Sequence, residues 1–319
     1  MNTRREFLQL LSLVAAGALV PRPTLAAEYS PKLGVAQWTF NSKFLSGEFS
    51  TALFPKYVHD NFGVNTIEWA STLLPNPNST AQYKAIVDAC RNYGMHSHAL
   101  LVDGPALGVS GSARRNHAID FYKPWIEAAH YLDCKYLRVN AWGSMGIQIG
   151  NLWSRVTTSA AKSVQHECAT SISLLLDIIK GSELTLLVEN HLDYSSNAMW
   201  LAELMQMIDD TRCRVMLDFG NWMYFGAGML PSFQDPYEGC RILAPYTASV
   251  SAKSHGFDAL GNETNVDYFK MIEILVSAGY EGYYVAEFET FSQDADPLDG
   301  IRKTLSLIEK ATMEAHKAN

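Results

Sequence analysis

The sequence repeats a two-part pattern along most of its length. A short run of apolar, β-branched or aromatic residues alternates with a longer segment whose apolar residues recur at helical spacing. The short runs predict strands at Leu33–Phe40, Val64–Ala70, His96–Val102, Tyr136–Ala141, Thr185–His191, Arg214–Phe219, Thr247–Ser254 and Gly282–Phe288. The longer segments predict helices at Phe54–Phe62, Ala81–Tyr93, Ala118–Leu132, Ser163–Ile179, Met199–Ile208, Val266–Ala278 and Ile301–Ala315.

The alternation predicts an α/β fold of the (β/α)8 barrel type, because parallel strands need helical crossovers. An open, doubly wound sheet is the alternative. It is the weaker interpretation, since no glycine-rich phosphate turn follows the first predicted strand. No linker or change of composition interrupts the chain after residue 30, so residues 28–319 are predicted to form one barrel domain.

Residues 1–27 have a different pattern, which is typical of an export signal. Arg4-Arg5 precedes a mostly apolar run, and small residues follow at Ala26-Ala27. The arginine pair resembles a twin-arginine signal. A chance pair in an ordinary secretory signal or a membrane anchor is the alternative. We expect a periplasmic or otherwise exported protein that has no membrane contact once the signal is removed.

The composition of the chain limits the classes of partner that it is expected to bind. The chain of 319 residues is 48% hydrophobic and has a net charge of −8, so a nucleic-acid partner gains no general electrostatic attraction. The five cysteines are an odd number without close pairs, which predicts small buried residues and not a disulfide framework. A small carbohydrate is the expected ligand, and a homo-oligomer remains open.

Four consecutive predicted strands end in ionisable residues. The ends carry Glu189-Asn190-His191, Asp218 with Asn221 beyond it, Ser251, Lys253 and His255 at alternate positions, and Glu287 with Glu289. The C-terminal strand ends of a barrel meet at one rim, so these groups should cluster. Three converging carboxylates repel one another unless a cation compensates them. We therefore predict one divalent metal per chain (Mn²⁺, Co²⁺, Mg²⁺ or Zn²⁺) held by Glu189, Asp218 and Glu287.

The remaining candidates are weaker individually. His255 is predicted as the fourth metal ligand, with an ordinary loop histidine as the alternative. His191 shares the face of Glu189 and is a candidate substrate contact, ligand or proton carrier. The other strand ends carry Trp38, Glu68, Asp103, Arg138, Asn140 and Trp142. Aromatic faces beside Arg, Asn and carboxylates suit a sugar, although packing alone explains a tryptophan equally well. From these we select Trp38, Glu68, Arg138 and Asn140 as substrate-binding residues.

The runs LRVNAWG, VENHLDYSSN, LDFGNW, SAKSHGFDALGNET and GYEGYYVAEFE resemble the xylose isomerase-like TIM-barrel superfamily, which includes sugar phosphate isomerases, epimerases and endonuclease IV. In its ketose 3-epimerase branch, Glu, Asp, His and Glu from strands five to eight hold a divalent metal, and both Glu residues shuttle a proton. The resemblance assigns these Glu and Asp positions to Glu189, Asp218 and Glu287.

Two positions depart from the family pattern. Ser251 stands where strand seven usually has a histidine, which leaves His255, His191 or a weak or absent metal as the open alternatives. Asn221 replaces a histidine that binds substrate in relatives, which makes it a candidate for substrate choice.

The resemblance implies a metal-dependent sugar isomerase or epimerase that acts through an enediolate. Glu189 and Glu287 would exchange the proton, Asp218 would hold the metal, and Lys253 would act with them by orienting oxygen atoms. A lyase or hydratase that eliminates a β-substituent from a 3-keto glycoside is the second interpretation. A sugar-binding barrel without catalysis is the third, and endonuclease activity is the least compatible with the acidic chain.

Overall fold

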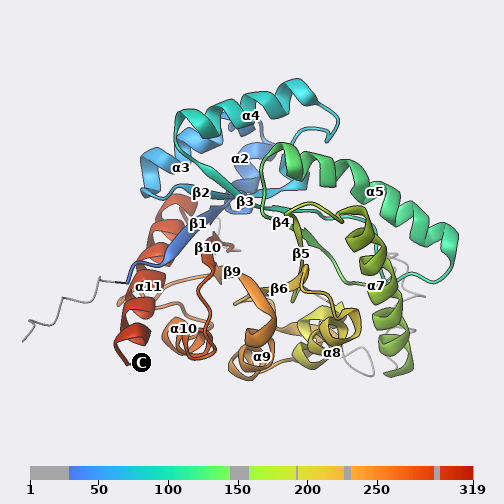
Figure 1. The fold of residues 1–319 in the computed structure, drawn as a ribbon. Helices are drawn as coiled ribbons and strands as arrows, with labels where there is room; N and C mark the ends of the chain where they lie inside the picture. The colour runs from blue at the N-terminus through green and yellow to red at the C-terminus, as the bar shows by residue number, and fades with distance from the viewer. Residues whose placement is uncertain (1–28, 144–157, 192, 226–230, 291–294, 319) are drawn as a thin grey trace, which may run out of the picture. The chain divides into compact units, whose positions relative to one another are not determined.

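Eight parallel strands close into a barrel in the computed structural model (Figure 1). The structure describes residues 29–143, 158–191, 193–225, 231–290 and 295–318. The barrel strands are β1 (Lys32–Ala36), β2 (Thr66–Ala70), β3 (His96–Leu101), β4 (Tyr136–Val139), β5 (Thr185–Glu189), β6 (Cys213–Asp218), β9 (Thr247–Ser254) and β10 (Tyr283–Phe288). Their order around the barrel is β1-β10-β9-β6-β5-β4-β3-β2. The predicted (β/α)8 barrel is therefore confirmed.

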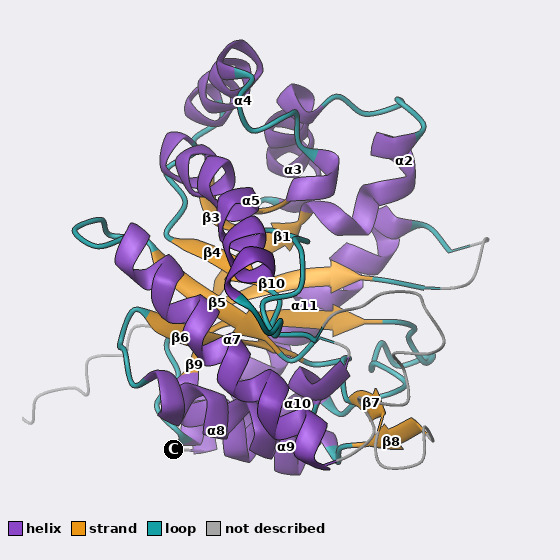
Figure 2. Cartoon of the chain, turned by 90° about the vertical axis from the view of Figure 1, so that its right-hand side faces the viewer, coloured by secondary structure: helices purple, strands orange, loops and turns teal. Residues whose placement is uncertain are grey.

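Helices surround these strands (Figures 1 and 2). They are α2 (Asn41–Leu45), α3 (Phe54–Phe62), α4 (Thr80–Asn92), α5 (Ser112–Tyr131), α7 (Thr158–Ile178), α8 (Ala198–Ile208), α9 (Pro236–Leu243), α10 (Tyr268–Ser277) and α11 (Pro297–Ala318). Every predicted helix is present, with its ends shifted by a few residues. Within the described ranges, each helix is too short or too polar to serve as a membrane span.

The residue pattern did not predict α2, α9 or a small hairpin, β7 (Met223–Phe225) with β8 (Pro231–Phe233). The hairpin and α9 lie between β6 and β9. In α9, the Asp235 side chain accepts a hydrogen bond from the backbone N–H of Glu238, and Pro236 occupies the first turn. These start signals are visible in the sequence, but the helix they begin is only eight residues long. Figure 2 shows the hairpin on the side to which the barrel strands point.

Five predicted strands end one to four residues earlier than expected. The first strand stops at Ala36, and Gln37–Phe40 forms a 3-10 turn, so Trp38 lies beyond the strand and not on it. The buried Gln37 side chain accepts a hydrogen bond from the backbone N–H of Ala70 at 3.1 Å, which replaces a continued ladder between β1 and β2. The fifth strand stops at Glu189, which leaves His191 in the following loop.

The apolar core has two parts because strand side chains alternate between two faces. Outward-facing residues such as Leu186 and Val188 pack against the helices in the larger part. The smaller part fills the barrel interior and consists of Ala99, Leu101, Tyr136, Leu187 and Met216. Glu189 follows Leu187 by two positions and therefore faces the same interior. An apolar floor thus lies beneath the polar strand ends.

The cysteines belong to this packing. All five are buried free thiols, namely Cys90, Cys134, Cys168, Cys213 and Cys240. The prediction of small buried residues without a disulfide framework is confirmed.

A buried histidine lies inside the barrel. His98 is 5% exposed, and its Nε2 is 2.8 Å from the hydroxyl of Ser249. Its ring packs between the rings of Tyr136 and Tyr283, with centroid distances of 5.0 and 4.7 Å. Burial lowers the pKa of His98 to about 3, so the imidazole is neutral in the folded protein at neutral pH.

This histidine should make stability depend on pH. The unfolded chain takes up a proton near pH 6.5 and the folded chain does not, so stability is lost as pH falls below 6.5. Between pH 7 and pH 5 the free energy of unfolding should fall by about 2 kcal/mol more in the unmodified protein than in His98→Gln. Urea denaturation at both pH values measures this difference. The exposed control His117→Gln should keep the full pH dependence, and equal slopes for all three proteins would contradict the assignment.

Candidate active site at the barrel mouth

A cavity of about 510 Å³ opens at the C-terminal ends of the strands. Its walls are formed by Trp38, Ala70, Leu101, Asp103, Arg138, Trp142, Glu189, His191, Asn221, Lys253, His255, Glu287 and Glu289. Most of the site residues predicted from the sequence are in this set. Asp218, which is fully buried, and Asn140 lie directly behind the wall and contact wall residues.

An ion-pair network fixes one side of the mouth. The Arg138 Nε lies 3.0 Å from Glu189 Oε2, and its Nη1 donates to Asp103 Oδ1 at 2.7 Å. Asn140 accepts from Arg138 at 2.7 Å and donates to Asp103 at 3.0 Å. Burial alone would lower the pKa of Arg138, but the carboxylates of Glu189 and Asp103 raise it, so the guanidinium stays charged. This side therefore holds a positive group beside Glu189 in fixed geometry.

Asn190 ties the ends of β5 and β6 together. It is fully buried, and its Nδ2 donates to the backbone carbonyls of Asp218 at 2.9 Å and Asn221 at 3.2 Å. Its Oδ1 accepts from the backbone N–H of Asp218 at 2.7 Å. The Asp218 Oδ1 in turn accepts from the backbone N–H groups of Gly220 and Asn221. Asn190 is thus a positioning residue that holds Asp218 in place.

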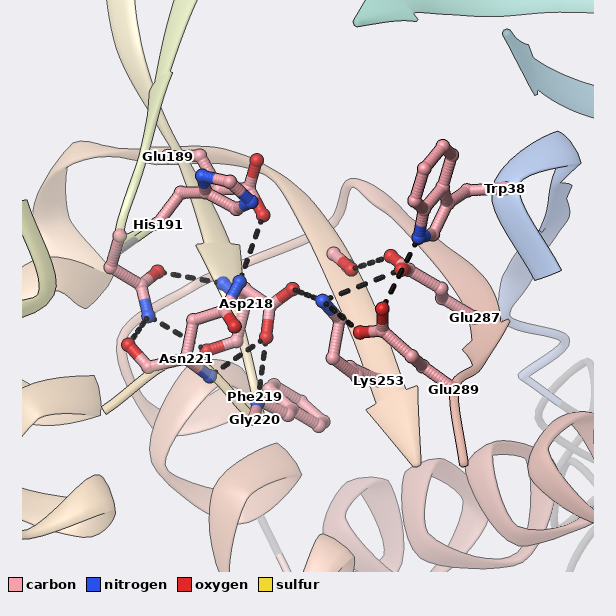
Figure 3. Close-up of polar contacts among 12 residues, drawn as sticks. Trp38, Glu189, His191, Asp218, Phe219, Gly220, Asn221, Lys253, Glu287 and Glu289 are labelled. Carbon is pink, nitrogen blue, oxygen red and sulfur yellow. Dashed lines mark hydrogen bonds and ion pairs between the residues drawn. The ribbon is translucent and has the colours of Figure 1, made fainter. Parts of the chain in front are cut away.

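Lys253 stands among the carboxylates on the other side (Figure 3). Its Nζ is 3.4 Å from Asp218 Oδ2, 3.4 Å from Glu287 Oε1 and 3.1 Å from Glu289 Oε2. The side chain is 5% exposed, and burial would lower its pKa, but Asp218 and Glu287 raise the pKa well above the ordinary lysine value. The ammonium is therefore permanently charged.

The buried carboxyl groups have shifted proton affinities. Burial raises the pKa of Asp218 to about 6, although Lys253 opposes the shift. Burial also raises the pKa of Glu189 and of Glu287, with Arg138 and Lys253 respectively as the main opposing charges. Carboxyl groups whose pKa lies nearer to neutral pH are suited to proton transfer.

Glu68 differs from its predicted role. It does not line the cavity but is buried on β2 beneath Ala70, at 1% exposure. Neither of its carboxyl oxygens has a hydrogen-bond partner among the described residues. Burial raises its pKa well above the ordinary glutamate value, and the neighbouring Glu287 and Glu189 add to the shift, which favours the protonated form.

The predicted metal ligands have other partners. Ser251 donates to Glu287 Oε2 at 3.0 Å, and the His255 Nδ1 lies 2.7 Å from the backbone carbonyl oxygen of Glu289. The Lys253 ammonium stands at the point where Asp218 and Glu287 converge. Across the described residues, no group of three His, Cys, Asp or Glu side chains is arranged to hold a metal ion. Because Lys253 occupies that point, the donor set as arranged does not fit a divalent metal, and no finding on the described residues supports the predicted one.

The chain belongs to the xylose isomerase-like TIM barrel family, whose model matches residues 57–311. The fold and the rim of ionisable strand ends agree with that membership. The family resemblance inferred from the sequence is therefore confirmed, whereas the twin-arginine signal lies outside the described residues and stays a prediction.

Solved structures show the same fold. A 3-keto-D-glucoside 4-epimerase from E. coli is 15% identical, with a TM-score of 0.63 over 88% of this chain and 100% of that chain. A xylose isomerase-like TIM barrel protein from Mycobacterium smegmatis in complex with magnesium is 12% identical, with a TM-score of 0.63 over 89% of this chain and 98% of that chain.

One curated relative matches a shorter segment. A C-glycoside deglycosidase alpha subunit from Arthrobacter globiformis is 33% identical over 84 residues, which are 25% of this chain and 24% of the relative. The match thus spans about a quarter of the relative's length.

Asp103, Trp142 and Glu289 stand near strand ends in the sequence but were not selected there as site residues. Each lies one to three residues beyond the end of a strand, and each lines the cavity. Glu289 also accepts a hydrogen bond from Trp38 Nε1 at 3.3 Å. Only their positions in the sequence could have identified these three residues, because a side chain just past a strand end reaches the mouth of a barrel.

The Asn190 clamp gives a stability prediction. Asn190→Ala should lower the free energy of unfolding by about 3 kcal/mol, because it leaves buried backbone groups of β6 without partners. Asn197→Ala, which removes the cap of α8, should cost only about 1 kcal/mol. Urea unfolding of both variants measures the two values, and equal losses would show that Asn190 is not a clamp.

Proposed function

We propose that this protein is a carbohydrate isomerase or epimerase that transfers a proton at a carbon next to a carbonyl group. The observation that carries the proposal is the placement of two buried glutamates, Glu189 and Glu287, on the wall of one cavity. They belong to β5 and β10, which are separated by β6 and β9 along one side of the barrel. A sugar in the cavity would therefore meet a carboxyl group on two sides.

The chemistry follows from this placement. One glutamate in its ionised form removes the proton, the C–H electron pair forms a carbon–carbon double bond, and the carbonyl electrons move to oxygen. The second carboxyl group returns a proton. Return to the same carbon from the opposite face inverts its configuration, and return to the neighbouring carbon moves the carbonyl group. The negative charge on oxygen requires a cation or hydrogen-bond donor in the cavity.

The rest of the wall suits a sugar. Trp38 and Trp142 contribute aromatic faces, and the Trp142 ring lies 6.1 Å from the ring of His191. Asn221 donates to Glu189 Oε1 at 3.3 Å and also lines the cavity, so it can orient that carboxylate or bond a hydroxyl group. Flat apolar faces beside directional polar groups bind the C–H face and the hydroxyl groups of a sugar.

Elimination from a 3-keto glycoside is the second candidate. It uses the same proton abstraction, but the electron pair then expels a substituent from the β-carbon. The 3-keto-glucoside epimerase and the deglycosidase subunit among the similar proteins favour it. His191 lines the same cavity, and its Nδ1 has no hydrogen-bond partner among the described residues. Burial lowers the pKa of His191 to about 4, so it is neutral at pH 7.

Deuterium exchange tests the proposal. Incubation with D-fructose or methyl 3-keto-D-glucopyranoside in D₂O should place deuterium beside the carbonyl of one of these probes. Glu189→Gln and Glu287→Gln should each slow exchange at least about 100-fold, because each removes a proton acceptor. The rate should fall as pH drops through the raised pKa of these carboxyl groups, since the base must be ionised.

Glu309→Gln, an exposed change on α11, is the matched control and should exchange normally. Product analysis separates the two candidates, since an epimer or isomer indicates the first and an unsaturated sugar with a released substituent the second. Sugar binding without exchange in the unmodified protein would reject both and indicate a binding barrel.

We also propose export by the twin-arginine route, supported by Arg4-Arg5 and the apolar run that follows. Replacement of both arginines by lysine should leave the protein in the cytoplasm of a bacterial host, as judged by fractionation. An unchanged exported fraction would indicate an ordinary secretory signal, and the double replacement is informative because it preserves charge.

A further inference from the structure

The register of β9 places two side chains at the levels of the neighbouring carboxylates. Ser251 pairs with Asp218 on β6, and Lys253 pairs with Glu287 on β10. An imidazole at position 251 would reach the space between Asp218 and Glu287. The shorter Ser251 hydroxyl instead donates to Glu287 at 3.0 Å. The donor that the family resemblance expects on this strand is therefore missing, and the next residue on the same face is a cation.

The positive charges at the mouth are not equivalent. Arg138 is held by Glu189 through its Nε and by Asp103 and Asn140 through its Nη1, so these two groups are directed into the wall. Lys253 lies 3.1–3.4 Å from three carboxylates and also lines the cavity. An ammonium has three donors on a rotatable stem, so one of them can turn from the half-exposed Glu289 to a substrate oxygen.

We infer that the ammonium of Lys253 does in this chain what the family resemblance assigns to a divalent metal. It compensates the buried charges of Asp218 and Glu287, and it donates a hydrogen bond to the oxygen that becomes negative when the substrate loses its proton. The ammonium keeps its proton throughout, so no oxidant, reductant or further reactant takes part. This inference rests on the proposed proton transfer and specifies which group stabilises its oxyanion.

The assignment has a consequence for metal binding. A divalent cation at the convergence of Asp218 and Glu287 would stand close to the ammonium, where like charges repel strongly in a buried site. The Lys253 ammonium must move away from Asp218 and Glu287 before such an ion can enter. The protein should therefore bind metal weakly until this lysine is replaced and a histidine is supplied at position 251.

The first experiment measures the metal content of the protein and its rate of deuterium exchange. The purified protein should contain less than about 0.1 equivalent of manganese, cobalt or zinc, and its exchange rate should change less than about twofold after EDTA or added Mn²⁺. Lys253→Met should lose at least about 100-fold in kcat for exchange with a KM change below about tenfold, because the donor acts on the transition state. Lys84→Met, exposed on α4, should behave normally.

The second experiment needs no turnover. Ser251→His/Lys253→Met should bind Mn²⁺ at about one equivalent in calorimetry, whereas the unmodified protein should show at least about 100-fold weaker binding. Circular dichroism checks that the variants fold. Lys253→Arg keeps the charge and is the substitute if the methionine variant does not fold. The arginine variant should bind no more Mn²⁺ than the unmodified protein does.

The outcomes separate the two hypotheses. Exchange that requires a bound metal in the unmodified protein would overturn the role of Lys253 and leave the proposed function intact. Full exchange activity in Lys253→Met would overturn it as well. Absence of exchange from both probe sugars, with and without metal, would reject the proposed function and with it the oxyanion role of Lys253.

Discussion

The gathering of two buried carboxylates and one half-exposed carboxylate around the ammonium of Lys253 is the interaction on which the site depends. Asp218, Glu287 and Glu289 would repel one another at the mouth of the barrel, and Lys253 lies within 3.4 Å of all three. Removal of one partner from such a buried group leaves an uncompensated charge, which costs several kcal/mol. The same charges that make the arrangement costly to break also hold the side chains in one geometry, which is what catalysis by positioning requires.

The barrel makes this arrangement possible because its interior has an apolar layer beneath the charged residues at the strand ends. Leu187 and Met216 fill the interior, and the residues two positions further along their strands are Glu189 and Asp218. A one-residue slip of either strand would turn its carboxylate toward the helices. The apolar layer therefore fixes the register of the strands, and the register fixes the position of the charges.

Much of this could be predicted from the sequence. The period-two strands and helical crossovers specified the closed parallel barrel, and the polar residues at successive strand ends specified its mouth, including Glu189, Lys253 and Glu287. The contacts between side chains of neighbouring strands could not be predicted. Nothing in the local pattern states that Arg138 reaches Glu189, or that Asn190 bonds the backbone of Asp218. Those contacts depend on side-chain directions across neighbouring strands, and Glu68 looked like a rim residue for the same reason.

Family resemblance and geometry give different roles to the same four strand ends. By resemblance the carboxylates are metal ligands, and a serine at position 251 is a missing ligand. By geometry Ser251 is a hydrogen-bond donor to Glu287, and the cation comes from the next inward residue of the same strand, Lys253. A fixed ammonium carries one positive charge where a metal carries two, so it leaves the carboxyl groups more basic than a metal would. Carboxyl groups in such a site remain good proton acceptors, but the ammonium polarises a carbonyl group less strongly than a metal does. This combination suits substrates in which an adjacent ketone already makes the C–H bond acidic.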